Sequence, residues 1–179
     1  ITYIPYYLDP ESGEYKFCYL ALITDYYTKE IVGYSVAPTL ESIYAIEALK
    51  MALDYYKGND LSQLIHHSDR GVQYASCQYT GLLKQYNIQI SMTETGNPKD
   101  NAVAERVNNT IKNELLKGMS FTSISEVLVA VKAAIRFYNE ERPHLSLDGL
   151  TPREAAKKRG EIDKRWISYR EKAIKAKVA

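Results

Sequence analysis

Three aromatic-rich runs at the start of the chain limit the fold more than any other feature of the sequence. They are TYIPYYL at residues 2–8, FCYLALITD at 17–25 and EIVGYSVA at 30–37, and short polar segments separate them. β-branched and aromatic residues are typical of strands, and sequential strands with short connections pair antiparallel. The first third of the chain is therefore predicted to be a three-stranded antiparallel meander.

Strand-like and helical segments alternate after the meander. In residues 39–58, apolar side chains recur at three- and four-residue steps, which predicts an amphipathic helix. The following segments predict a strand, a helix, a strand and then only helices: 61–69, 76–87 and 88–93, followed by 100–118, 123–139, 151–159 and 161–177. This order predicts an α/β domain with a mixed five-stranded sheet flanked by helices, and extra C-terminal helices.

Charge is distributed unevenly along the chain. The 179 residues have a net charge of +1, but residues 151–179 carry ten Lys or Arg against four Asp or Glu. The turn sequence DGLTP divides the chain into a core, residues 1–150, and a basic helical tail, residues 151–179. A basic tail on an acidic body indicates a polyanionic partner, although the tail alone fits a solvated helix better.

The sequence contains no signal for a membrane. No apolar run approaches the roughly 20 residues needed to cross a bilayer. The first residues, ITYIPYYLDPESGEY, lack the basic segment and apolar core of a secretion signal. We expect a cytoplasmic protein that does not bind membranes.

Two carboxylates are the leading candidates for catalysis. Asp69 follows the apolar end of the fourth predicted strand, in HHSDRGVQY, and Glu105 lies on the helix predicted from residue 100. Mg²⁺ and Mn²⁺ prefer oxygen ligands, and a pair of such ions can stabilise the attacking and leaving oxygens of phosphoryl transfer. The pair therefore predicts a metal site for phosphoryl transfer, which normally needs a third carboxylate.

One face of the helix bearing Glu105 is polar. Asn109 and Lys112 follow at i+4 and i+7, about 140° from the centre of an apolar stripe on the same helix. A solvated polar face explains this pattern as well, and the pattern alone favours that interpretation. In the metal-site interpretation, Lys112, Asn109 and Arg106 are the candidate DNA contacts.

Several segments resemble a family of enzymes. IHHSDRGVQYAS, MTETGNPKDNAVAERVNNTIKNELL and FYNEERPHLSLDGLTPREA are similar to the catalytic core of insertion-sequence transposases of the retroviral-integrase type, over residues 1 to about 159. The resemblance implies a ribonuclease H-like fold and an Asp-Asp-Glu triad in which Asp69 is the second aspartate and Glu105 the glutamate. It implies cleavage and transfer of DNA strands with two Mg²⁺ or Mn²⁺ ions.

The same resemblance implies the partners of the protein. These are element-end DNA, target DNA and further copies of the chain in the working complex, associated with the bacterial nucleoid. In the family the first aspartate directly precedes the ITYI-like strand, and the printed chain begins at Ile1. We expect this aspartate before Ile1, and not a replacement by Asp9 or Asp25. The alternative is a catalytically incomplete remnant that only binds DNA or self-associates.

Three further residues are expected to support the site. Asn101 precedes the helix of Glu105 and is predicted to cap it. His67 is the better family match of two adjacent histidines, and strand alternation places only one of them, His66 or His67, toward Asp69. His144 lies in YNEERPHLSL, where a helix stop and packed turn is the favoured interpretation.

Sixteen tyrosines raise the alternative of a tyrosine recombinase. That chemistry needs arginines and a histidine around a nucleophilic tyrosine. The nearest approximation is Arg136, Tyr138, Arg142 and His144. Most tyrosines occur instead as adjacent pairs in predicted strands and helices, where half-buried rings are the simpler interpretation. We therefore set this alternative aside.

Overall fold

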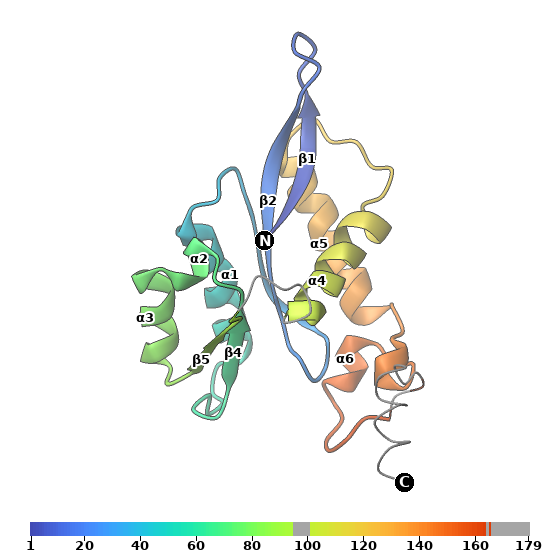
Figure 1. Cartoon of the computed structure of the whole chain (residues 1–179). Helices are drawn as coiled ribbons and strands as arrows, with labels where there is room; N and C mark the ends of the chain where they lie inside the picture. The colour runs from blue at the N-terminus through green and yellow to red at the C-terminus, as the bar shows by residue number, and fades with distance from the viewer. Residues whose placement is uncertain (95–100, 164, 166–179) are drawn as a thin grey trace.

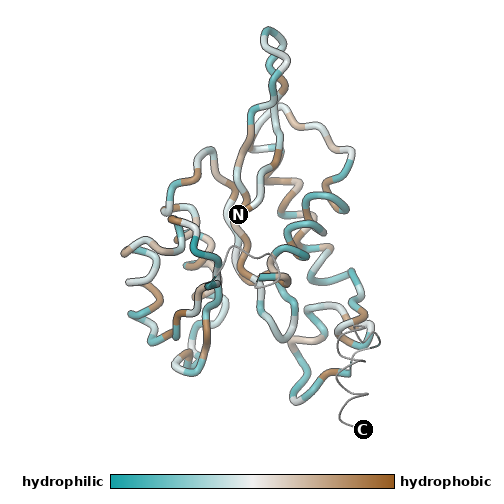
Figure 2. Tube along the Cα trace, viewed as in Figure 1, coloured by the Kyte–Doolittle hydropathy of each residue, from teal (hydrophilic) through white to brown (hydrophobic). Residues whose placement is uncertain are grey.

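The computed structural model describes residues 1–94, 101–163 and 165. Three strands, β1 (Thr2–Leu8), β2 (Tyr15–Thr24) and β3 (Ile31–Ala37), form an antiparallel sheet in that order. The predicted meander is therefore confirmed. The β1–β2 hairpin projects from the body of the molecule, as Figure 1 shows, and its tip is largely hydrophilic (Figure 2).

A second sheet consists of two parallel strands, β4 (Ile65–Ser68) and β5 (Gln89–Met92). Five strands were expected, but the expectation of one five-stranded sheet is wrong, because they form separate sheets of three and two. In the described part of the chain β1 pairs only with β2, and β4 pairs only with β5. Ile1 and the residues of β4 line one cavity.

Helices cover both sheets (Figure 1). The small sheet is accompanied by α1 (Ser42–Tyr55), α2 (Val72–Ala75) and α3 (Cys77–Gln85). On the other side of the molecule lie α4 (Ala102–Asn109), the π-helix η2 (Thr110–Leu115) and α5 (Ile124–Glu140). The helix predicted over residues 100–118 thus changes its winding at Thr110, where the amide of Leu116 donates to the carbonyl of Ile111, five residues earlier.

The buried side chains form two separate hydrophobic cores. The large core joins the strands β1 to β3 to α4, η2 and α5, and its buried members are Ile4, Cys18, Leu20, Ile31, Val107, Ile111, Leu116, Val127, Val131, Ala134, Ile135 and Tyr138. The small core joins α1 to α3 and β5, and its buried members are Ala45, Ile46, Leu49, Leu53, Tyr79, Leu83 and Ile88. Each core holds one side of the molecule together.

Glycine at one position brings these regions close. A Cβ atom on Gly33 of β3 would lie only 2.2 Å from the carbonyl oxygen of Ala48 in α1. Contacts this short do not occur between real Cβ atoms and backbone oxygens, so a larger residue would push α1 away from the sheet. Gly33 therefore permits the close packing of α1 on β3.

The described helix in the C-terminal segment is shorter than predicted. After η3 (Leu145–Leu147), α6 spans only Pro152–Ala155, against a predicted helix over 151–159. Residues 161–163 are not helical, and most of the helix predicted over 161–177 lies outside the described residues. Pro152 and Ala155 are buried, and Arg153 lies 2.9 Å from the buried carboxylate of Glu30. The start of the predicted tail thus packs on the core.

Among the residues that the structure describes, no helix is both long and apolar enough to cross a membrane.

Candidate active site

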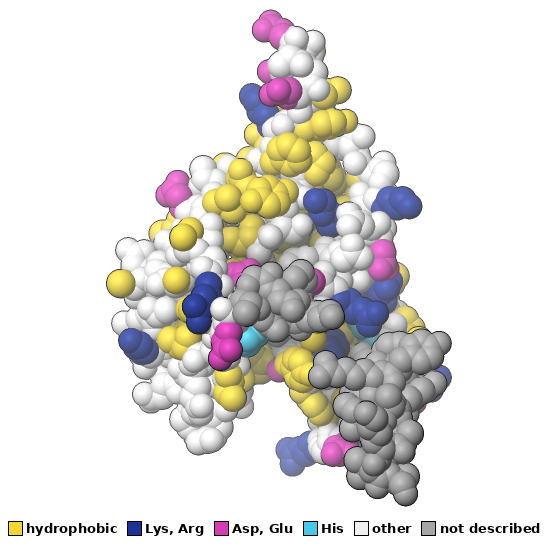
Figure 3. Space-filling view, in the orientation of Figure 1, with side chains coloured by type: hydrophobic (Ala, Val, Ile, Leu, Met, Phe, Trp, Pro, Cys, Tyr) yellow, Lys and Arg dark blue, Asp and Glu magenta, His cyan; other side chains and the backbone are white. Residues whose placement is uncertain are grey.

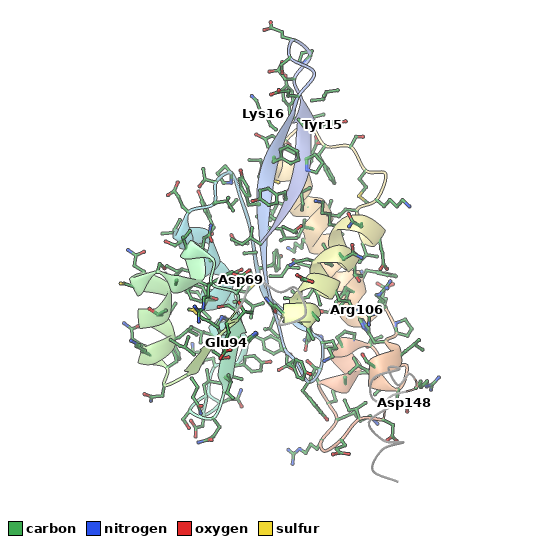
Figure 4. All side chains as sticks on the ribbon, viewed as in Figure 1. Tyr15, Lys16, Asp69, Glu94, Arg106 and Asp148 are labelled. Carbon is green, nitrogen blue, oxygen red and sulfur yellow. The ribbon has the colours of Figure 1, made fainter. Side chains whose placement is uncertain are left out.

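A cavity of about 480 Å³ lies between the two cores. Asp69 lines it from the end of β4, and Glu105 lines it from α4. Figure 4 shows Asp69 on the side of the small sheet that faces α4. Ile1, Asn101 and His67 also line the cavity. The structure therefore brings together two carboxylates that are 36 positions apart in the sequence.

The loop after β4 orients Asp69. Its Oδ1 accepts a hydrogen bond of 2.9 Å from the amide of Gly71. A Cβ atom on Gly71 would lie 2.9 Å from the same oxygen. The carboxylate is otherwise exposed, so one oxygen is held by the loop and the side chain remains accessible from the cavity. Glycine at position 71 is therefore part of the geometry of Asp69.

The packing of α4 orients Glu105. Val107 is buried in the large core, whereas Glu105, two positions earlier in the same helix, is exposed to the cavity. Asn101 occupies the N-cap position, as predicted, but its side chain makes no capping hydrogen bond. The predicted capping is therefore wrong, and Asn101 faces the cavity instead.

The three candidate DNA contacts point to different places. Lys112 lines a second cavity of about 410 Å³, next to Ile4 and Met119, and does not line the first. A π-helix advances less around its axis per residue than an α-helix, which moves Lys112 out of line with Glu105. Asn109 accepts a hydrogen bond of 2.6 Å from Asn113. Whether any of them binds DNA stays a prediction.

The third candidate, Arg106, lies on the side of α4 toward α5 (Figure 4). There the positive charge of Arg106 lowers the pKa of His144 and opposes the rise in the pKa of Tyr138. The rings of Tyr138 and His144 are in edge contact, with centroids 4.8 Å apart. His144 therefore packs against α5, some way from the two carboxylates, and does not line their cavity.

Both histidines of β4 line the cavity, and which of them faces Asp69 stays a prediction. They bond to different elements: Nδ1 of His67 lies 2.9 Å from Oγ of Ser91, and Nε2 of His66 lies 3.1 Å from the hydroxyl of Tyr79. Burial, and then the charge of His67, lower the pKa of His66 to about 4. His66 is thus neutral at physiological pH and ties β4 to α3.

Two buried polar atoms at the cavity lack a hydrogen-bond partner in the described part of the chain. They are Oγ of Ser68, which directly precedes Asp69, and Oδ1 of Asn108, one turn after Glu105. Buried polar atoms without partners are uncommon in folded proteins and mark places where a water, an ion or a ligand binds. The sequence analysis overlooked Asn108, although its spacing of i+3 from Glu105 places it on the same side of the helix.

These donors suit a hard divalent cation in kind, since carboxylate and amide oxygens are the ligands that Mg²⁺ and Mn²⁺ prefer. The number of ligands is smaller than a complete site requires. Among the described residues no group of three or more His, Cys, Asp or Glu side chains could hold a metal ion. Whether Asp69 and Glu105 belong to a carboxylate triad stays a prediction.

A third carboxylate that lines the cavity, Asp25, accepts hydrogen bonds from other parts of the protein. Its Oδ1 accepts from the amide of Thr28 at 2.7 Å and its Oδ2 from the hydroxyl of Tyr56 at 2.8 Å. Burial, and then the charge of Asp25, raise the pKa of Tyr56. Both oxygens of Asp25 thus accept hydrogen bonds within the protein, and its exclusion as a metal ligand stays a prediction.

Sequence comparison identifies the family. A model described as "Integrase core domain" matches residues 1–98, and a second model with the same description matches residues 86–152. The chain belongs to the integrase core domain family.

Two bacterial members of the family show the likeness in sequence. The transposase for insertion sequence element IS629 of Shigella sonnei is 35% identical over 141 residues, which are 79% of this chain and 47% of that protein. The transposase for insertion sequence element IS904 of Lactococcus lactis is 33% identical over 158 residues, or 88% of this chain and 59% of that protein. The chain thus spans about half the length of the curated relatives it matches.

Solved integrases show the same fold. The catalytic core domain of HTLV-2 integrase, solved in complex with magnesium, superposes with a TM-score of 0.60 at 18% identity, covering 86% of this chain and 90% of that one. A chain of the simian T-cell lymphotropic virus intasome superposes with a TM-score of 0.68 at 18% identity, covering 92% and 55%. The integrase core described here therefore has the ribonuclease H-like α/β fold.

Proposed function

We propose that this integrase core is the catalytic domain of a DNA transposase, which cleaves DNA strands and transfers their ends with the help of divalent metal ions. The observation that carries the proposal is the pair Asp69 and Glu105, which line one cavity from different elements, the end of β4 and helix α4. The names of the bacterial relatives support the same function.

In this proposal Asp69 and Glu105 hold Mg²⁺ or Mn²⁺, with two ions in the complete site. When bound, the ions would offset the negative charge that develops on the attacking and leaving oxygens of a phosphodiester. The amide of Gly71 keeps the carboxylate of Asp69 in position, and α4 does so for Glu105. Asn108 and Ser68 offer polar atoms that could contact the substrate or an ordered water.

The third carboxylate is proposed to directly precede Ile1. Ile1 and Asp69 line the same cavity. A residue attached to the nitrogen of Ile1 would therefore start beside this cavity.

The reaction consists of two displacements at phosphorus. In cleavage, water attacks a phosphodiester at the end of the element and a 3′-hydroxyl leaves. In strand transfer, that 3′-hydroxyl attacks a phosphodiester of the target DNA and displaces its 3′ oxygen. The roles proposed for the cavity are to align the nucleophile with the leaving group and to exclude competing water.

The proposed partners are element-end DNA, target DNA and further copies of the chain, acting at the nucleoid in the bacterial cytoplasm. The simian viral relative was solved as an intasome, and the HTLV-2 core was solved in dimeric and trimeric forms. Residues 1–150 are proposed as the catalytic core and residues 151–179 as a basic tail that contacts DNA phosphates.

The alternative is a remnant that binds DNA or self-associates without catalysis. The residue encoded before Ile1 discriminates between the two, because only aspartate completes the triad.

The experiment uses the chain extended upstream, with aspartate directly before Ile1, and assays Mn²⁺-dependent cleavage and joining of element-end DNA. We expect activity that Glu105→Gln abolishes. A matched variant, Glu47→Gln, alters a carboxylate on α1 that does not line the cavity and should leave the activity unchanged. Activity that survives Glu105→Gln would refute the assigned mechanism.

A further inference from the structure

Positive charges from three segments act on His144. Arg106 comes from α4, Arg142 from the segment after α5, and Lys29 from the turn between β2 and β3. All three lower the pKa of His144, in addition to the larger effect of burial, so all three lie near its ring. We call Arg106, Arg142 and His144 the RRH cluster.

The positive charge of the RRH cluster is only partly neutralised inside the protein. Nη2 of Arg142 lies 2.7 Å from Oε2 of Glu114, which is the single carboxylate among the charged groups that act on His144. Within the described residues Arg106 makes no hydrogen bond or ion pair. The guanidinium of Arg106 therefore adds a positive charge beside an ion pair that is already formed, and like charges are gathered at a cost in stability.

His144 has an unused polar atom at this place. Its Nε2 is buried and has no hydrogen-bond partner in the described part of the chain. One face of the ring packs on Tyr138, and the backbone amide of His144 donates to the carbonyl of Leu150, so the ring is held in place. A buried polar atom without a partner marks a place where a water, an ion or a ligand binds.

The RRH cluster adjoins the candidate active site. Glu105 and Arg106 are neighbours in α4, so this helix directs a carboxylate into the cavity and a guanidinium to the cluster. Figure 3 shows Lys and Arg side chains gathered beside the centre of this face, near a histidine. Phosphates follow one another at about 3.4 Å of helix axis along one DNA strand. A strand that reacts in the cavity thus has further phosphates within reach of α4.

We propose that the RRH cluster binds a backbone phosphate of the DNA strand that enters the cavity. The proposal rests on the function proposed above and assigns it a specific contact. Guanidinium groups match the geometry of phosphate oxygens, and Arg106 has its guanidinium available for such a contact. Protonated His144 would add a donor at Nε2.

Proton uptake provides a second signature. The free protein holds the pKa of His144 at about 4, through burial and then the charges of Arg142, Arg106, Lys29 and, in the opposite direction, Glu114. A phosphate at the cluster stabilises the protonated ring and raises this pKa. The bound state then holds more protons than the free state, so affinity for DNA increases as the pH falls from about 7 toward 5.

The test measures binding of the full chain to a fluorescent 20-base-pair duplex of arbitrary sequence by anisotropy, without divalent metal, over a range of salt and pH. Arg106→Ala should weaken binding by about fivefold to tenfold at low salt and lower the salt slope by about one. Arg106→Lys should retain most of the affinity. His144→Gln should remove the strengthening at acidic pH.

The matched control is Arg136→Ala, which removes the same charge from an exposed position on α5 that does not act on His144. We expect an effect below about twofold. If Arg106→Ala and His144→Gln behave like this control while the wild-type chain binds DNA, the phosphate site is refuted and the proposed function stands. If the wild-type chain does not bind DNA, the proposed function falls as well. Changed self-association with unchanged DNA binding would assign the cluster to a protein partner and also refute it.

Discussion

The two carboxylates of the candidate active site, Asp69 and Glu105, lie on elements that are packed differently. Glu105 stands on a helix that is anchored in the large core, which combines three strands with α4, η2 and α5. Asp69 follows a four-residue strand, β4, which pairs with β5, and Ile90 of β5 packs against the small core. The geometry of the site therefore depends on the relative placement of two independently packed regions, and one of them has far fewer buried side chains.

The largest expected effect tests whether Asp69 and Glu105 contribute equally to strand cleavage. In the chain extended by aspartate before Ile1, Asp69→Asn and Glu105→Gln should each reduce strand cleavage by about a thousandfold or more, because each removes several kcal/mol of charge stabilisation at the metal site. Single-turnover rates with labelled element-end DNA measure the effect, and urea unfolding should be unchanged. If only one of the two substitutions reduced cleavage, a site shared by both carboxylates would be contradicted.

Truncation of the cores compares their contributions to stability. Ile111→Ala in the large core and Leu83→Ala in the small core remove side chains that are 0% and 1% exposed. Each should cost about 2–5 kcal/mol of the free energy of unfolding, with the larger loss at Ile111. Urea titrations followed by circular dichroism measure both, and Ile43→Ala, at a position 51% exposed, is the control. A larger loss at Leu83 would reverse the ranking of the two cores.

Acid should weaken both regions, through His66 in one and His144 in the other. The pKa of each is about 4 in the folded protein, chiefly because of burial, against an ordinary value of 6.5. The unfolded chain therefore binds more protons between these values, so stability is complete above about pH 6.5 and is lost as the pH falls toward 4. For His66 the loss amounts to at most about 3 kcal/mol.

Replacement separates the two contributions. His66→Gln should flatten part of the loss of stability between pH 6.5 and 4, and His144→Gln another part, as measured by urea titrations across this range. DNA should raise the pKa of His144 in an NMR titration, because His144 adjoins the proposed phosphate. An acid profile that neither substitution changes would show that other groups control it.

The smallest expected effect concerns the orientation of Asp69. Gly71→Ala places a methyl group 2.9 Å from Oδ1 of Asp69 and displaces the carboxylate. Cleavage should fall by about tenfold, since small displacements of a catalytic group are costly. Folding should be unaffected, because φ at this position is −54° and alanine adopts it freely. Gly81→Ala, on α3 with open space around it, is the matched control.

Local patterns predicted much of this molecule. The meander, α1 and α5 followed from alternation and helical periodicity, and Asp69 and Glu105 reached one cavity as the family resemblance implied. The division into two sheets could not be predicted. A single sheet would need a pairing between strands far apart in the sequence, such as β1 and β4, and local sequence patterns do not specify such pairings. The failed cap of Asn101 has a similar cause, since Asn101 faces the cavity instead of the helix end.

The position of Lys112 could not be predicted for a different reason. The calculation of helix faces assumed 3.6 residues per turn throughout, and η2 departs from that winding. The error grows along the helix, so it affects Lys112, which lies within η2. The DNA contacts of this helix are therefore best sought on its first two turns.

The π-helix has a consequence for how this helix tolerates changes in length. Ile111 and Leu116 are both buried although five positions separate them, so η2 behaves as an α-helical turn with one extra residue. Deletion of one exposed residue, such as Asn113, could let the segment rewind as an α-helix without moving either buried neighbour. An insertion at the same point cannot be accommodated by rewinding to an α-helix. Natural variation in the length of this segment should therefore favour loss of one residue over gain.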